Sequence, residues 1–148
     1  MRERMLDEID IQILNILQRD ARTPIKQVAK AVNLSSPAVS NRIQRLEVER
    51  YIIGYQAQVD PIALGLGTKA FICLEIAPVQ KKEFYPYIKQ CKNVVECNCV
   101  TGDYSMLLEV LFENTIELDH FINELQRFGR TKTLIVFSTT VGHRGVEL

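Results

Sequence analysis

Residues 33–47, Asn-Leu-Ser-Ser-Pro-Ala-Val-Ser-Asn-Arg-Ile-Gln-Arg-Leu-Glu, decide the fold of the first third of the chain. The pair Ser36-Pro37 predicts a helix start, because Ser can cap the first turn and Pro has no N–H to leave unpaired there. Val39, Ile43 and Leu46 then recur at helical spacing and predict one buried face. The opposite face carries small polar side chains and a cation, which are groups that hydrogen-bond base edges and phosphates.

Two more helices are expected before this segment. Apolar residues recur at helical spacing over about 7–20, with Asp7 as a plausible N-cap and Asp10 as an imperfect capping-box partner. Thr23-Pro24 repeats the cap-plus-proline signal and predicts a second helix with a buried stripe from Ile25 to Val32. Two short helices joined by a tight turn, the second exposing polar groups, form a helix-turn-helix.

The spacing alone fits a generic three-helix bundle with a polar outer face equally well. Two observations favour DNA. The outward face of the third helix is short of acidic residues until Glu47. Residues 21–50 also hold six basic side chains against two acidic ones, a local charge of +4. A short positive window of this kind is typical of a small nucleic-acid-reading element, although a solvated helix face looks similar.

The whole chain is electrically balanced. Its 148 residues carry 18 Lys and Arg against 18 Asp and Glu, so bulk charge does not hold it to nucleic acid or membrane. Hydrophobic residues make up 47% and charged residues 24%, which excludes a disordered chain. No apolar run is long enough to span a membrane, and residues 1–10 contain no signal region, so a cytoplasmic protein without a membrane partner is expected.

The second half predicts a β-α-β-β-α-β order. Strands are expected over 69–77, 94–100, 104–112 and 134–140, and helices over 84–91 and 118–125. This is the ferredoxin-like arrangement. Two helices cover only one face of such a sheet, and the other face is expected to carry Phe71, Cys73, Cys97 and Cys99 or their alternates. An uncovered apolar face is usually a partner surface, so the domain should dimerise or oligomerise.

The linker between the halves, residues 51–67, is rich in turn residues and is expected to contain a short strand over 52–59. The boundary should fall near Asp60-Pro61, giving domains 1–60 and 61–148. The fold class is therefore α+β: a three-helix, winged-type helix-turn-helix domain followed by a ferredoxin-like sensing domain.

No catalytic or metal site is expected. Cys97 and Cys99 lie on one strand face, but zinc needs two further ligands and the only histidines are His120 and His143. The four cysteines are expected to be reduced thiols. Phosphate-binding glycine loops and nucleophile elbows are missing from the sequence, and Asp103 after Gly is more often a turn residue than a catalytic acid. Neither an enzyme nor a cofactor is predicted.

A set of motifs in order along nearly the whole chain resembles the Lrp/AsnC, or feast/famine, family of transcription regulators. The motifs are Leu6-Asp7-Glu8-Ile9-Asp10, Leu17-Gln18-Arg19-Asp20-Ala21-Arg22, Val32-Asn33-Leu34-Ser35, Val39 to Glu47, Ile52-Ile53-Gly54-Tyr55, Val95-Glu96-Cys97 and Val100 to Tyr104. The resemblance implies DNA binding through the helix-turn-helix, dimers formed through the C-terminal sheet, and assembly into octamers or larger discs.

The resemblance also implies an amino-acid effector bound between dimers near a Gly-Asp loop. In this chain the loop is Gly102, Asp103, Tyr104 and Ser105, and the matching neighbours are Cys99, Leu134, Ile135 and Val136. Ser105 stands where the family usually has a second acidic residue, and a hydroxyl is a weaker partner for an ammonium group than a carboxylate. Arg50-Tyr51 also departs from the family, which tends to have Gly before the Ile-Ile-Gly-Tyr segment.

The predicted function is sequence-specific recognition of double-stranded DNA by a transcription regulator. Ser40, Asn41, Gln44 and Arg45 are expected to meet the major groove. Lys26, Lys30 and the capped amides near Ser36 and Pro37 are expected to hold phosphates, and Arg42 to support the helix or touch the DNA backbone. The alternative is a small-molecule sensor or oligomeric scaffold whose helix-turn-helix contacts protein.

Overall fold

The computed structural model describes residues 6–148, and its contacts divide the chain into two compact units. The first contains the residues up to Gln58 together with Val141–Leu148, and the second is Val59–Thr140. The final eight residues therefore group with the N-terminal unit, which the sequence did not predict. The domain division at residue 60 stays a prediction.

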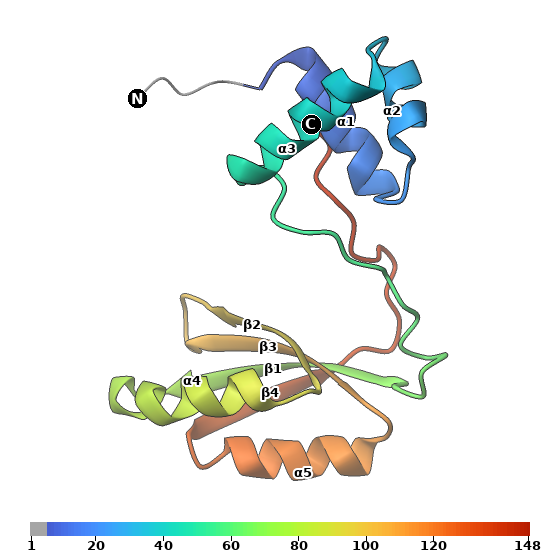
Figure 1. The fold of residues 1–148 in the computed structure, drawn as a ribbon. Coiled ribbons are helices and arrows are strands. Elements are labelled where there is room, and N and C mark those ends of the chain that lie inside the picture. Colours follow the sequence, from blue (N-terminus) through green and yellow to red (C-terminus); the bar gives the residue numbers. More distant parts are fainter. Residues whose placement is uncertain (1–5) are drawn as a thin grey trace. The chain divides into compact units, whose positions relative to one another are not determined.

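The N-terminal unit contains three helices (Figure 1): α1 Glu8–Arg19, α2 Ile25–Ala31 and α3 Ser36–Val48. They pack around a core that includes Ile13, Val28, Val39 and Leu46, all fully buried. The capping box of α1 is confirmed. Asp7 accepts a hydrogen bond from the Asp10 N–H at 2.8 Å, and the Asp10 carboxylate accepts from the Asp7 N–H at 3.2 Å.

The predicted caps of the next two helices are each wrong by one residue. Thr23 does not cap α2, because its hydroxyl donates to the Asp20 carbonyl at 2.8 Å and Pro24 takes the N-cap position. Ser35, not Ser36, caps α3, and its Oγ accepts from the Ala38 N–H at 3.3 Å. Either of two adjacent serines can cap a helix that contains Pro in its first turn, so the sequence alone does not choose between them.

The C-terminal tail lies along α1. Asn15 donates to the Leu148 carbonyl at 3.1 Å and accepts from the Leu148 N–H at 3.3 Å, while Gln18 donates to the Val146 carbonyl at 2.9 Å. Leu14, Leu17, Val146 and Leu148 help to line one apolar pocket. The N-terminal unit is thus built from both ends of the described chain.

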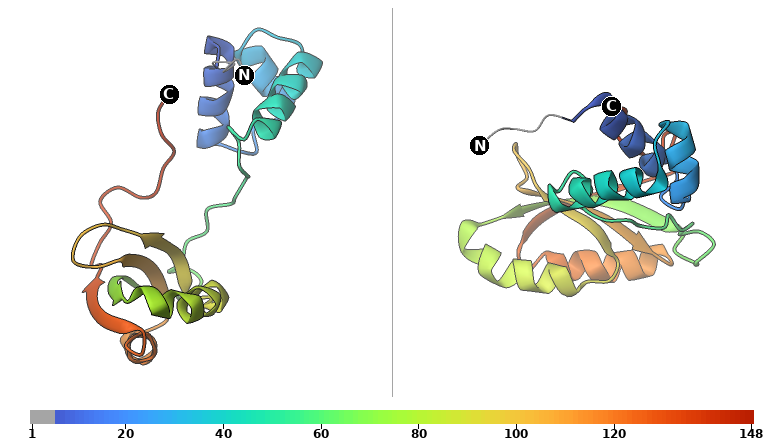
Figure 2. Two further views of the ribbon diagram at one scale, coloured as in Figure 1. Left: turned by 90° about the vertical axis from the view of Figure 1, so that its left-hand side faces the viewer. Right: turned by 45° about the horizontal axis from the view of Figure 1, so that its top comes forward.

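The second unit has the predicted β-α-β-β-α-β order. Its strands are β1 Thr68–Ile76, β2 Val94–Cys99, β3 Met106–Phe112 and β4 Gly129–Ile135, and its helices are α4 Lys81–Gln90 and α5 Thr115–Leu125. A short 3-10 turn, Pro78–Gln80, precedes α4. All strand pairs are antiparallel, in the order β2-β3-β1-β4, and both helices cover the same face (Figure 2).

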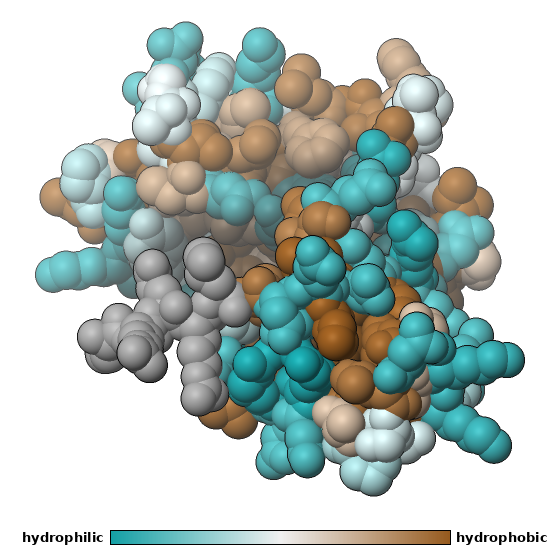
Figure 3. Space-filling view, turned by 90° about the horizontal axis from the view of Figure 1, so that it is seen from above, coloured by the Kyte–Doolittle hydropathy of each residue, from teal (hydrophilic) through white to brown (hydrophobic). Residues whose placement is uncertain are grey.

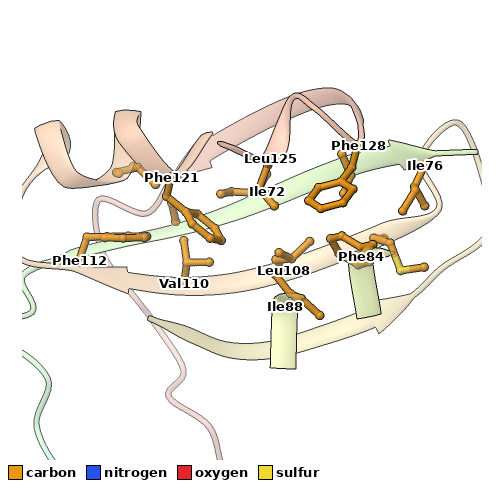
Figure 4. Packing of buried hydrophobic residues seen from close by; sticks show 14 residues of the cluster. Ile72, Ile76, Phe84, Ile88, Leu108, Val110, Phe112, Phe121, Leu125 and Phe128 are labelled. Atoms are coloured by element: carbon orange, nitrogen blue, oxygen red, sulfur yellow. The ribbon is translucent and has the colours of Figure 1, made fainter. Parts of the chain in front are cut away.

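The core of this unit lies between the sheet and its two helices (Figure 4). Ile72 and Leu108 are fully buried neighbours on β1 and β3, and Phe84 and Leu125 cover them from α4 and α5. Phe84 meets Phe128 edge to face, with ring centroids 5.4 Å apart. The alternation predicted for β3 is confirmed, because Met106, Leu108, Val110 and Phe112 are all buried.

Two predicted strands are corrected. The last strand runs over Gly129–Ile135, not 134–140, because β1 offers pairing partners only from Ala70 to Ile76. Residues 52–59 form no strand in the described structure, since no neighbouring segment of residues 6–148 pairs with them.

The predicted faces of β2 are also corrected. Cys97 pairs with Leu108 and Cys99 with Met106, so both cysteines lie on the helix-covered side of the sheet. A register shift between Val94 and Glu96 moves the alternation by one residue. Phe71 and Cys73 do lie on the uncovered face, because they alternate with the buried residues of β1.

Candidate functional site

The middle of the exposed face of α3 carries small, polar, uncharged side chains. Ser40, Asn41 and Gln44 are all exposed, while their neighbours Val39 and Ile43 are buried. Pro37 is exposed and Ser36 half-buried at the start of the helix. Side chains of the Ser, Asn and Gln type carry the donors and acceptors that read base edges in a major groove. Figure 3, which views the structure from above, shows hydrophilic side chains interspersed with apolar ones.

Cations flank this face. Lys26 and Lys30 are both exposed on α2, the helix that precedes the turn. The first turn of α3 adds backbone N–H groups without helical partners, one of which Ser35 caps. Helix N-termini and lysines are the groups that commonly hold phosphates. The phosphate-contacting set predicted from the sequence is therefore accessible.

Arg42 and Arg45 have acidic partners on α1 that the sequence reasoning missed. Arg42 Nη1 donates to Asp7 Oδ2 at 2.7 Å and to Asp10 Oδ1 at 2.8 Å. Arg45 Nη2 donates to the other oxygen, Asp10 Oδ2. The Asp10 side chain is 1% exposed, and the arginines are 27% and 30% exposed. The spacing Asp7-x-x-Asp10 is the signal for these ion pairs in the sequence, but a capping box alone accounts for it equally well.

The ion pairs shift the pKa values of Asp7 and Arg42. The hydrogen bond from Arg42 lowers the pKa of Asp7 below its ordinary value, and the bonds from Asp7 and Asp10 raise the pKa of Arg42. Both groups therefore stay charged at neutral pH. Arg45 is held on one side only, since its Nε is buried without a hydrogen-bond partner in the described structure.

Glu47, the acidic residue at the end of the exposed face of α3, also has a hydrogen-bond partner. Tyr55 donates its hydroxyl to Glu47 at 2.7 Å. Burial, followed by this hydrogen bond, raises the pKa of Tyr55 to about 12, so the hydroxyl keeps its proton. The contact fixes the Glu47 carboxylate towards the segment that follows α3.

The predicted effector loop forms the turn between β2 and β3. Gly102 has a φ of +111° and Asp103 is exposed at the tip. Ser105 is tied to β1, because its Oγ accepts from the Ile76 N–H at 3.0 Å and donates to the Leu74 carbonyl at 3.3 Å. Its hydroxyl therefore has protein partners already.

The remaining effector residues lie at two ends of the sheet. The guanidinium carbon of Arg130 lies over the Tyr104 ring, 5.4 Å from its centroid. Cys99 is exposed at the end of β2. Leu134 pairs with Phe71, and the Val136 N–H donates to the Lys69 backbone carbonyl, near the opposite end of β1. At about 3.3 Å per residue, three to five strand residues separate the two groups by roughly 10–17 Å. One protomer does not bring all the predicted effector residues together.

Within residues 6–148, no three His, Cys, Asp or Glu side chains gather as they would around a metal ion. None of the helices in that range has the length and apolar character that a membrane-spanning helix requires.

Comparisons with known proteins identify both units. The family model for the AsnC-type helix-turn-helix domain matches residues 6–47, and the model for the Lrp/AsnC ligand binding domain matches residues 69–146. An uncharacterized HTH-type transcriptional regulator of Bacillus subtilis, YezC, is 33% identical, covering 93% of this chain and 98% of its own. The HTH-type transcriptional regulator FL11 of Pyrococcus horikoshii is 32% identical, with coverage of 90% and 91%.

A solved structure agrees over almost the full length. The feast or famine regulatory protein of M. tuberculosis, complexed with L-methionine, has a TM-score of 0.91 and 26% identity. The match covers 97% of this chain and 100% of that one. The two units described above are therefore those of a known architecture, and the chain belongs to the Lrp/AsnC family of transcriptional regulators.

Proposed function

We propose that this protein is a transcription regulator that reads double-stranded DNA with α3. The observation that carries the proposal is the accessible row of Ser40, Asn41 and Gln44 on the second helix of a helix-turn-helix. Asn and Gln amides can each form two hydrogen bonds with one base edge, and Ser hydroxyls can donate or accept. A scaffold helix that packed against protein would be expected to expose apolar side chains at these positions instead.

Phosphate contacts would fix the position of this helix on the duplex. Lys26 and Lys30 supply two cations on α2, and the N-terminus of α3 at Ser36 and Pro37 supplies the Ser36 N–H and the positive end of the helix dipole. Such contacts carry no sequence information but supply most of the affinity and its salt dependence.

Assembly would proceed through the sheet face that α4 and α5 leave uncovered. Phe71 on β1 lies beside Leu134 on β4, which is 48% exposed, and Cys73 lies beside Leu107 on β3. Burial of these side chains against a second copy would stabilise a dimer. Larger assemblies, such as the octamer implied by the family, would bring several helix-turn-helix units to one DNA molecule.

A small metabolite such as an amino acid would modulate this assembly at the turn Gly102–Ser105. The M. tuberculosis relative in complex with L-methionine supports an amino acid as the ligand class. Asp103 is the exposed carboxylate of the turn and would meet an ammonium group, because the Ser105 hydroxyl is occupied by β1. A ligand that fits one arrangement of dimers better than another would shift the spacing of the DNA-reading units.

A mobility-shift salt series tests DNA binding directly. The probe is the fragment immediately upstream of the coding sequence of this protein, and the competitor is a random duplex of equal length. A protein making several phosphate contacts should lose roughly 10³-fold in affinity between 50 and 200 mM salt. An affinity that does not change with salt would refute DNA binding and favour a scaffold. A thermal-shift screen of the twenty amino acids then identifies the effector.

A further inference from the structure

Asp10 is an unusual residue in the N-terminal unit. It is the one charged side chain that is fully buried within residues 6–148, and it lies on α1 next to the apolar core of the three helices. Both of its oxygens are engaged, Oδ1 by Arg42 and Oδ2 by Arg45 and the Asp7 N–H. Because an unpaired buried carboxylate is strongly disfavoured, this residue ties both arginines to α1.

Arg45 therefore has two competing uses. It can stay on Asp10, or it can turn outward to a guanine in the major groove, as its place on the helix first suggested. A bidentate Arg–guanine contact improves discrimination by roughly 5- to 150-fold. Turning Arg45 outward would leave Oδ2 of the buried Asp10 with only the Asp7 N–H, and losing a hydrogen bond to a charged group costs roughly 13- to 150-fold in the corresponding equilibrium. The comparison favours Arg45 staying on Asp10.

Arg42 is restrained in the same way. It bridges Asp7 and Asp10, so the cluster contains two guanidinium groups and two carboxylates and is neutral as a whole. Of the six basic residues in the window 21–50, two are thus neutralised by α1 and lie at the edge of the reading face. Ser40, Asn41 and Gln44 themselves stay exposed and uncharged.

We propose that Asp10 is a positioning residue for DNA recognition, which withholds Arg42 and Arg45 from phosphates and orients the uncharged reading face of α3. The inference rests on the proposed DNA-binding function. Its consequence is that specificity comes from hydrogen-bonding side chains, while indiscriminate phosphate binding is kept low. Free arginines on the same face would bind any duplex and would reduce the preference for one sequence.

The test is the substitution Asp10→Asn in the full-length protein, with Glu49→Gln as the matched control. Both substitutions remove one negative charge, but Glu49 is exposed at the C-cap of α3. Affinities for the upstream fragment and for the random duplex are measured from 50 to 200 mM salt, after circular dichroism has established the helical content of each variant.

With Asp10→Asn, the preference for the upstream fragment should fall at least 10-fold. The slope of log affinity against log salt should steepen by about 1 for each helix-turn-helix, because Arg45 becomes free to contact a phosphate while Arg42 keeps its ion pair with Asp7. Glu49→Gln should shift both duplexes equally. A folded Asp10→Asn protein with an unchanged preference and slope would overturn the inference alone. A wild-type protein that binds neither duplex in a salt-dependent way would overturn the proposed function, and this inference with it.

A second variant decides the matter if Asp10→Asn does not fold. Arg45→Lys keeps a cation that can pair with Asp10 but loses the planar fork that binds guanine at two atoms. If Arg45 serves Asp10, this substitution should leave the preference for the upstream fragment and the salt slope unchanged. A loss of preference beyond about 5-fold would place Arg45 on a base and overturn the inference.

Discussion

A methyl group added at Gly129 should lower the stability of the sheet unit strongly. It opens β4 opposite Ile76, with a φ of +159°. A Cβ added there would lie 1.7 Å from the Glu75 carbonyl oxygen and 2.9 Å from its carbon. Both atoms belong to the backbone of β1, so no side chain can move aside to relieve the clash.

The cost of Gly129→Ala has two parts. A non-glycine residue in a disfavoured backbone region costs about 1–3 kcal/mol. Forcing extra volume into a packed site typically costs about 1–3 kcal/mol more. The unfolding free energy of the sheet unit should therefore fall by about 2–6 kcal/mol. For a domain of this size, each kcal/mol lowers the melting temperature by about 4–8 °C, so a drop of at least about 8 °C is expected.

Alanine substitutions at two other glycines separate the backbone cost from the packing cost. Gly102 has a positive φ of +111° but open space around its Cβ, so Gly102→Ala should show the backbone cost alone. Gly54 has open space and no positive φ, so Gly54→Ala should change stability by less than about 0.5 kcal/mol. Thermal and urea unfolding of the full chain measure all three. A Gly129→Ala protein no less stable than Gly102→Ala would refute the argument from the close backbone approach.

Three further predictions follow from particular contacts. Phe84→Ala should lower the unfolding free energy of the sheet unit by about 3–5 kcal/mol in urea, because Phe84 is fully buried against Phe128, whereas Phe84→Leu should cost less. The pKa of Asp7 is lowered by Arg42, so its contribution to stability is present above the unfolded value of 3.8 and is lost as pH falls below it. Acid titrations should therefore be flatter below about pH 4 for Asp7→Asn than for the wild type, and parallel curves would contradict this. Asp103→Ala should change assembly or the thermal shift with amino acids while the N-terminal helices stay folded, and an unaltered response in both would remove Asp103 from the effector site.

Much of the fold could be predicted because its helices and inner strands follow simple periodicities. The helix over Glu8–Arg19 shows its period of 3.6 in the sequence, and β3 is a short apolar run in which every second residue is buried. The edge strand β4 was misplaced for a physical reason. Arg130 and Lys132 are exposed on it, as is common on edges that must not pair further, so it lacks the apolar signal of an inner strand.

The candidate site was predictable in its residue types but not in its partners. The helical wheel placed Asn41 and Gln44 on the exposed face, where the structure has them. The same wheel placed Arg45 there, yet its long side chain reaches Asp10 on another helix. A wheel describes the direction of Cβ on one helix, whereas an ion pair depends on how two helices approach. Likewise, the bulge in β2 that turns Cys97 towards the helices leaves no mark in the residue pattern.

The docking of Val141–Leu148 on α1 has a consequence for the order in which the protein matures during synthesis. The ribosome makes α1, α2 and α3 first, then the whole sheet unit, and only then the segment that hydrogen-bonds to Asn15 and Gln18. The N-terminal unit can form its three helices early, but it gains these last contacts only after the sheet unit has been translated. A nascent chain would therefore carry an unfinished N-terminal unit until translation passes residue 148.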